Sequence, residues 1–141
     1  MGVGKSSVAR HLSSLCGARR VDLDSYIEGR DGRSIADIID AEGEPAYREI
    51  ESSALADLLT NEPAPIWALG GGTGTIVRNR ELLREHDFGA LWLEASFEHC
   101  WLNIAFSRKT RPLARDRAAA EKLFNERQKT YCLAEWHFIV R

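Results

Sequence analysis

Hydrophobic and polar residues follow two different patterns along this chain. In several segments, apolar residues recur every three or four positions, which indicates amphipathic helices. Between these segments lie short continuous apolar runs, which are typical of strands covered on both faces. We expect helices at 6–16, 25–32, 34–43, 44–61, 79–86, a segment that begins at Ser96, and 118–133. We expect strands at 19–24, 66–69, 90–93 and 136–140.

These elements alternate between strand and helix, which predicts a parallel sheet with helices on both of its faces. The predicted fold class is therefore α/β, with three α/β/α layers. The chain has 141 residues and shows neither a repeat nor an interdomain linker, so we expect one domain spanning 1–141. Ligands of such a sheet bind at the carboxyl ends of its strands. The conspicuous polar and glycine-rich segments fall at or near that edge.

The first residues match part of a phosphate-binding loop. G-V-G-K-S-S at 2–7 fits the end of the pattern G-x-x-x-x-G-K-[ST]. In that pattern backbone N–H groups surround the phosphates of a nucleotide, the lysine reaches the outer phosphates, and the next hydroxyl binds Mg²⁺. The helix that follows points its positive end at the same anion. Taken alone, the segment also fits a glycine- and serine-rich tail.

Two aspartates lie at the end of the first predicted strand, in Asp22-Leu23-Asp24. In an extended segment, alternate side chains point to one side, so we expect both carboxylates to face the same way. A phosphoryl-transfer enzyme needs one carboxylate near Mg²⁺ and another that orients or deprotonates the attacking hydroxyl. The alternative is a solvated loop with helix-capping aspartates.

Three further segments have both a functional and an ordinary interpretation. Arg48 lies one helical turn from both Glu44 and Glu51, which fits a surface ion-pair ladder or an arginine held towards an anionic substrate. Three consecutive glycines, 70–72, fit a flexible loop or a close approach of backbone to a ligand. The basic segment 107–117 fits a solvated loop, a nucleic-acid patch, or a lid that closes over a triphosphate.

Bulk properties narrow the possible partners and compartment. The net charge is −2 and the isoelectric point is near 6.1, which argues against a nucleic-acid partner bound through overall charge. No apolar stretch is long enough to span a membrane. The three cysteines are odd in number and far apart, which suggests reduced thiols and a cytoplasmic protein. The four histidines share no ligand spacing, so we expect no structural zinc.

Taken together and in order, these segments resemble the shikimate kinase family, which has a P-loop fold of the nucleoside-monophosphate-kinase-like type. The resemblance covers G-V-G-K-S-S, V-D-L-D, the block 34–51, L-G-G-G, R-P-L-A and E-R-Q-K-T-Y. The block 34–51, L-G-G-G and R-P-L are specific to the family. The resemblance implies that ATP phosphorylates the 3-hydroxyl of shikimate, giving ADP and shikimate 3-phosphate on the route to chorismate and the aromatic amino acids.

The resemblance also implies residues for the nucleotide half of the site. The residues of the lysine loop would bind the phosphates of ATP; they are Gly2, Val3, Gly4, Lys5, Ser6 and Ser7. The Ser6 hydroxyl would ligate Mg²⁺, and Asp22 would support the ion through water. Arg111, in a lid at about 107–117, would reach the phosphates. The catalytic residues implied are Lys5, Asp24 and Arg111.

For the shikimate half, the resemblance implies that Asp24 holds the hydroxyls and aligns or deprotonates the attacking one. Arg48 and Arg127 would bind the carboxylate of shikimate, and Glu51 would orient Arg48. The glycines that lie against the substrate ring would be Gly70, Gly71 and Gly72. By the same resemblance, we expect a monomer that binds neither nucleic acid nor a membrane.

The chain also departs from the family pattern. The family has a strand before the lysine loop and a loop and helix after the last strand, so we expect this sequence to be truncated at both ends, with the first strand missing. Thr73 and Gly74 follow the three glycines where the family more usually has A-V. Two alternatives stay open: another small-molecule P-loop kinase, such as a gluconate kinase, and a non-catalytic ligand-sensing domain of the same fold. Intact chemical residues count against the second.

Overall fold

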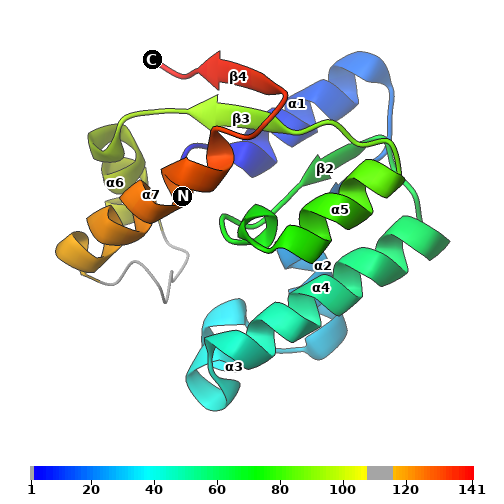
Figure 1. Cartoon of the computed structure of the whole chain (residues 1–141), viewed down its shortest axis with the longest axis horizontal. Helices are drawn as coiled ribbons and strands as arrows, with labels where there is room; N and C mark the ends of the chain where they lie inside the picture. The colour runs from blue at the N-terminus through cyan, green and yellow to red at the C-terminus, as the bar shows by residue number, and fades with distance from the viewer. Residues whose placement is uncertain (1, 108–115) are drawn as a thin grey trace. The chain divides into compact units, whose positions relative to one another are not determined.

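The computed structural model describes residues 2–107 and 116–141 (Figure 1). These residues divide into two compact units. One unit is Gly4–Thr73, and the other combines residues 2–3 with the described part of 74–141. Each unit contains one pair of parallel strands, and the alternating sequence pattern predicts this parallel pairing.

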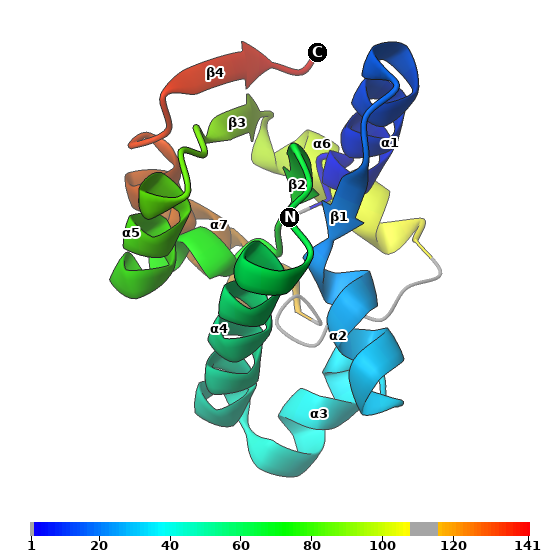
Figure 2. The same ribbon diagram turned by 90° about the vertical axis from the view of Figure 1, so that its right-hand side faces the viewer.

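The unit Gly4–Thr73 contains four helices and two strands. They are α1 (Lys5–Cys16), β1 (Arg20–Asp22), α2 (Leu23–Asp31), α3 (Ile35–Glu42), α4 (Glu44–Asn61) and β2 (Ile66–Ala68). Strands β1 and β2 run parallel, with Asp22 opposite Ala68, so both strands end at the same edge (Figure 2). Helix α1 packs against this pair, and α2 and α3 pack against α4. Apolar side chains that are at most 2% exposed form the core; they include Leu23, Ile27, Ile38, Leu55 and Leu58.

The second unit contains three helices and two strands among its described residues. They are α5 (Val77–Glu85), β3 (Leu91–Glu94), α6 (Phe97–Ala105), α7 (Arg117–Tyr131) and β4 (Trp136–Ile139). Strands β3 and β4 pair in parallel from Leu91 opposite Trp136 to Glu94 opposite Ile139. Helices α6 and α7 pack through Ile104 and Ala120, with Phe97 and Trp101 against them. A short 3-10 helix, Thr73–Thr75, which the sequence pattern did not predict, precedes α5.

Local capping explains where most helices begin and end. The side chain of Ser34 accepts a hydrogen bond from the Asp37 N–H at 3.1 Å and starts α3, as predicted. Gly17 ends α1 in the left-handed conformation, with φ of 59°. One expectation is wrong. Because Asp22 caps α2 through the Ser25 N–H at 3.2 Å, the helix already begins at Leu23, and the two aspartates do not share an extended segment.

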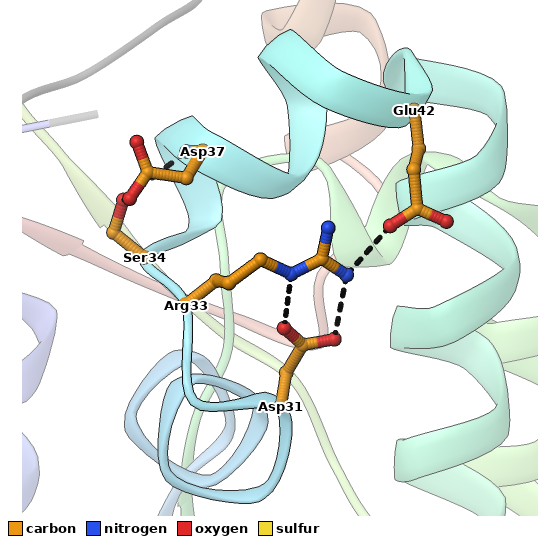
Figure 3. A network of polar contacts seen from close by, with 5 residues as sticks. All are labelled: Asp31, Arg33, Ser34, Asp37 and Glu42. Carbon is orange, nitrogen blue, oxygen red and sulfur yellow. Dashed lines mark hydrogen bonds and ion pairs between the residues drawn. The ribbon is translucent and has the colours of Figure 1, made fainter.

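The turn between α2 and α3 is fixed by a cluster of charged side chains (Figure 3). The guanidinium of Arg33 binds both carboxylate oxygens of Asp31, at 2.6 and 3.0 Å, and reaches Glu42 at 2.6 Å. The Arg33 guanidinium therefore links the end of α2 to the end of α3. The hydrogen bond from Arg33 lowers the pKa of Asp31 below its ordinary value.

Among residues 2–107 and 116–141, no helix is both long and apolar enough to cross a membrane.

Candidate active site

The helix that follows the lysine loop presents an uncapped N-terminus. Gly4 precedes α1 in the left-handed conformation, with φ of 92°, which suits glycine. No side chain caps α1, and its first turn contains no acidic residue. The first backbone N–H groups of a helix have no partner within the helix, and the helix dipole favours an anion there. Lys5 and Ser6 lie in this first turn, so the geometry suits a phosphate group.

Gly2 belongs to the other unit and has its own steric reason to be glycine. Its φ is 63°, and a Cβ on it would collide with the backbone carbonyl of Cys100. The Gly2 carbonyl accepts a hydrogen bond from the Asn103 side-chain amide at 2.7 Å. Helix α6 therefore holds this part of the loop closely, and any side chain at residue 2 would push it away.

The hydroxyl and carboxylate predicted to hold Mg²⁺ lie together. The Ser6 hydroxyl, at the start of α1, donates a hydrogen bond of 2.5 Å to Asp22 Oδ2, at the end of β1. Both are hard oxygen donors of the kind that Mg²⁺ prefers, and Mg²⁺ usually keeps several waters and binds phosphate oxygens besides. The described residues include no group of three acidic, histidine or cysteine side chains that could hold a metal ion by themselves. The pair therefore fits an ion shared with a nucleotide.

The end of β2 brings two carboxylates and a hydroxyl towards one point. An ideal Cβ on Gly70 would lie 3.0 Å from Asp24 Oδ1, 3.1 Å from Glu51 Oε2 and 3.2 Å from Thr73 Oγ1. Asp24 comes from the first turn of α2 and Glu51 from α4. The absence of a side chain at Gly70 leaves room for all three groups beside the strand end.

Arg48 forms a largely buried ion pair, not a surface ladder. Its Nη1 lies 2.8 Å from Glu51 Oε1, and its Nη2 lies 3.2 Å from Glu44 Oε1. The Arg48 side chain is 16% exposed and that of Glu51 is 0% exposed. Burial alone would lower the pKa of Arg48, but Glu51 and Glu44 outweigh it and raise the pKa. The guanidinium therefore stays charged.

The glycine run approaches this arginine closely. A Cβ on Gly72 would collide with the guanidinium of Arg48. The backbone at Gly72 therefore covers one side of the arginine, and Glu51 holds its Nη1 edge. The interpretation of the three glycines as a close approach of backbone fits this contact better than a flexible loop does.

Two residues that the sequence reasoning did not assign to the site complete the surroundings of Glu51. Thr73 is 0% exposed, and its hydroxyl donates to Glu51 Oε2 at 2.7 Å. The Tyr47 hydroxyl lies 3.4 Å from the same oxygen. Burial, with a smaller contribution from Glu51, raises the pKa of Tyr47, so its phenol stays protonated. The signals available in the sequence were a hydroxyl directly after the glycines and a tyrosine one helical turn before Glu51.

Two predicted arginines, Arg127 and Arg111, come from later parts of the chain. Arg127 is on α7 in the second unit and is 7% exposed. Arg111 and most of the predicted lid lie outside the described residues. At the end of that segment, Arg117 begins α7, with its guanidinium over the rings of Phe97 and Trp101, at 5.4 and 5.9 Å from their centroids.

Comparisons with known proteins agree with one another. A family model described as "Shikimate kinase" matches residues 1–141. The shikimate kinase of Caulobacter vibrioides is 38% identical over 141 residues, which cover 97% of this chain and 68% of that protein. The shikimate kinase of Streptococcus thermophilus is 41% identical over 114 residues, covering 80% of this chain and 68% of that one.

Solved structures give the same family name. A shikimate kinase from Acinetobacter baumannii in complex with shikimate has a TM-score of 0.90 and 30% identity, covering 100% of this chain and 79% of that one. A shikimate kinase from Aquifex aeolicus has a TM-score of 0.81 and 27% identity, covering 99% of this chain and 82% of that one.

Proposed function

Because this chain belongs to the shikimate kinase family and has its α/β P-loop fold, we propose that the residues described above bind ATP and shikimate and bring them together. The reaction is transfer of the γ-phosphate of ATP to the 3-hydroxyl of shikimate, giving ADP and shikimate 3-phosphate, in the biosynthesis of chorismate and the aromatic amino acids. The family assignment decides against the gluconate-kinase-like and ligand-sensing alternatives.

The lysine loop and the start of α1 hold the phosphates of ATP in this proposal. The contributing residues are Gly2, Val3, Gly4, Lys5, Ser6 and Ser7. Lys5 places its ammonium on the outer phosphates, where negative charge spreads during transfer. Ser6 and Asp22 would hold Mg²⁺, which would offset the negative charge of the phosphates. Arg111, in a lid at about 107–117, adds a second positive charge over the phosphates.

The other end of the site recognises shikimate. Arg48 and Arg127 bind the carboxylate of shikimate, because planar guanidinium groups match a carboxylate with two parallel hydrogen bonds. The backbone of glycines 70–72 lies against the ring and its hydroxyls. Asp24 accepts hydrogen bonds from hydroxyls of shikimate, and its place next to Gly70 lets the ring approach without a side chain between them.

Transfer itself needs positioning and charge more than covalent help from the protein. The oxygen of the 3-hydroxyl forms a bond to the γ-phosphorus as the bond from that phosphorus to the bridging oxygen of ADP breaks. The proton of the hydroxyl passes to the Asp24 carboxylate. Lys5 and Arg111 stabilise the charge that gathers on the transferred oxygens.

Three broader expectations belong to the same proposal. The chain forms one domain spanning 1–141, with a lid at about 107–117. It acts as a monomer in the cytoplasm, where ATP is abundant. It binds neither nucleic acid nor a membrane, in line with its net charge of −2.

The convergence of Asp24, Glu51 and Thr73 on Gly70, next to the buried Arg48 ion pair, supports this proposal most strongly. The test is a coupled ADP-release assay with ATP, Mg²⁺ and shikimate. Asp24→Asn keeps the shape of the side chain but cannot take the proton, so we expect kcat to fall by about two orders of magnitude or more.

Asp87→Asn is a matched control, because Asp87 is exposed and its positive φ of 61° suits asparagine equally well. It should leave turnover unchanged. Full shikimate-dependent turnover by Asp24→Asn would remove Asp24 from the proposed chemistry.

A further inference from the structure

We propose that Thr73 is a positioning residue for shikimate binding. Its hydroxyl fixes the buried carboxylate of Glu51, and Glu51 in turn sets the guanidinium of Arg48 in the orientation that receives the carboxylate of shikimate. The inference rests on the proposed role of Arg48. It assigns a function to the residue that directly follows the three glycines.

The hydroxyl of Thr73 donates a hydrogen bond to Glu51 Oε2, a buried carboxylate oxygen that would be destabilising without a donor. Glu51 is 0% exposed, so each of its carboxylate oxygens needs a donor from the protein. Oε1 takes Arg48 Nη1 at 2.8 Å, and Oε2 takes the Thr73 hydroxyl at 2.7 Å. The Tyr47 hydroxyl, at 3.4 Å from Oε2, is beyond the usual range for an O–H···O bond. Thr73 is therefore a closer donor to this oxygen than Tyr47 is.

The backbone fixes where the Thr73 hydroxyl lies. The Thr73 N–H donates to the Gly70 carbonyl at 3.3 Å, which closes a turn over the glycines. The same turn puts the Gly72 backbone against the guanidinium of Arg48. One turn thus holds Arg48 in two ways, by direct contact through Gly72 and through Glu51 by the hydroxyl of Thr73.

Without this hydroxyl the carboxylate would lose its fixed orientation. The last torsion of a glutamate side chain is broad, so hydrogen bonds, not torsional preference, choose its angle. An arginine paired with a turning carboxylate samples more orientations, and binding shikimate must then order it again at an entropic cost. The loss should therefore appear in the affinity for shikimate and not in the rate of phosphoryl transfer.

The test uses three variants and two ligands. Thr73→Val keeps the branched shape and removes the hydroxyl, Thr73→Ser restores a hydroxyl, and Thr60→Val makes the same change at an exposed threonine of α4. The ligands are shikimate and shikimate methyl ester, which has no negative charge to bind a guanidinium. Calorimetry gives Kd for each ligand, and the ADP-release assay gives kcat and the KM for ATP.

We expect Thr73→Val to raise the Kd of shikimate about tenfold, since a hydrogen bond to a charged group contributes on this scale. The Kd of the methyl ester, the KM for ATP and kcat should stay close to their original values. Thr73→Ser should recover most of the shikimate affinity, and Thr60→Val should lose none. If Thr73 were needed only for folding, Thr73→Val would instead weaken the binding of shikimate, of the methyl ester and of ATP together.

Wild-type affinity of Thr73→Val for shikimate would overturn the inference, and so would an equal loss for the two ligands or a failure of serine to restore binding. If valine prevents folding, Thr73→Ala replaces it under the same criteria. Arg48→Gln, which removes the positive charge, separates the two levels of the proposal. If Arg48→Gln does not reduce the preference for shikimate over its ester, the role of Arg48 fails. If Arg48→Gln reduces that preference while Thr73→Val does not change it, only the role of Thr73 fails.

Discussion

Replacing Gly72 with alanine is expected to displace Arg48 while leaving the surrounding strand and helix in place. A Cβ at this position would collide with the guanidinium of Arg48, which is the far end of a flexible side chain and can move away. Moving it breaks the 2.8 Å contact with Glu51 and leaves that carboxylate buried without its charge partner. The substitution therefore acts on the ion pairs of one arginine, with Glu51 and Glu44, although the residue changed is a glycine.

The expected magnitude follows from the burial of the two partners. Removing one partner of a fully buried ion pair costs about 3–5 kcal/mol. The Arg48 side chain keeps 16% exposure and can reach water once displaced, so we expect a loss of about 2–3 kcal/mol in the free energy of unfolding. The affinity for shikimate should fall about ten- to a hundredfold, because a charge-assisted pair of hydrogen bonds to its carboxylate is lost.

Urea unfolding and calorimetric titration with shikimate measure these two effects. Gly74→Ala is the matched control, because Gly74 lies two residues away, and a Cβ on it would meet no atom within 4 Å. It should change neither quantity beyond experimental scatter. If Gly72→Ala binds shikimate as tightly as the original chain, Arg48 is not held by this contact in the way the geometry implies.

Two further predictions concern the loop and the charged turn. Gly2→Ala should destabilise the chain more than Gly17→Ala. Both glycines have a φ near 60°, but only at Gly2 would the added Cβ meet a backbone carbonyl of α6. The melting temperatures of the two variants measure the strained backbone with the clash and without it. Arg33→Gln should lower the melting temperature near neutral pH but not in strong acid. The folded-state pKa of Asp31 lies below its ordinary value of 3.8, so the stability from this pair is present above that value and disappears as the pH falls through the folded-state pKa. A loss that is independent of pH would show that Arg33 stabilises the turn by packing and not through its ion pairs with Asp31 and Glu42.

Local signals predicted the helices well because their ends depend on neighbouring residues. The helix at 44–61 has the bounds that the sequence pattern predicts, and Ser34 and Ser96 cap their helices through the N–H three residues later. Two helices begin two residues earlier than predicted, α2 at Leu23 and α5 at Val77. Helix α2 begins early because the side chain of Asp22 caps it, and a D-x-D pattern alone does not tell a capping aspartate from a strand residue.

The candidate site was harder to predict because its ion pair can be told from an ordinary surface pair only by its burial. Spacing along α4 places Arg48 and Glu51 on one face, but spacing is the same for an exposed ladder and a buried pair. The approach of Gly72 to the guanidinium and the hydrogen bond from Thr73 distinguish the two, and both come from residues more than 20 positions away. Such contacts form only in the packed structure. The sequence of α4 alone therefore fits both an exposed ion-pair ladder and a buried ion pair.

The glycines after β2 contribute to the site by the groups they allow to approach. Gly70 leaves room for carboxylates from α2 and α4, and Gly72 leaves room for the arginine of α4. A side chain at Gly72 would displace the guanidinium of Arg48, and one at Gly70 would crowd the carboxylates of Asp24 and Glu51. Neither glycine lies within β2, which ends at Ala68. Substitutions here should therefore leave the pairing of β1 with β2 unchanged and alter ligand affinity, whereas substitutions in the strand core should alter stability first. This separation makes the glycines a sensitive place to test how the chain recognises shikimate.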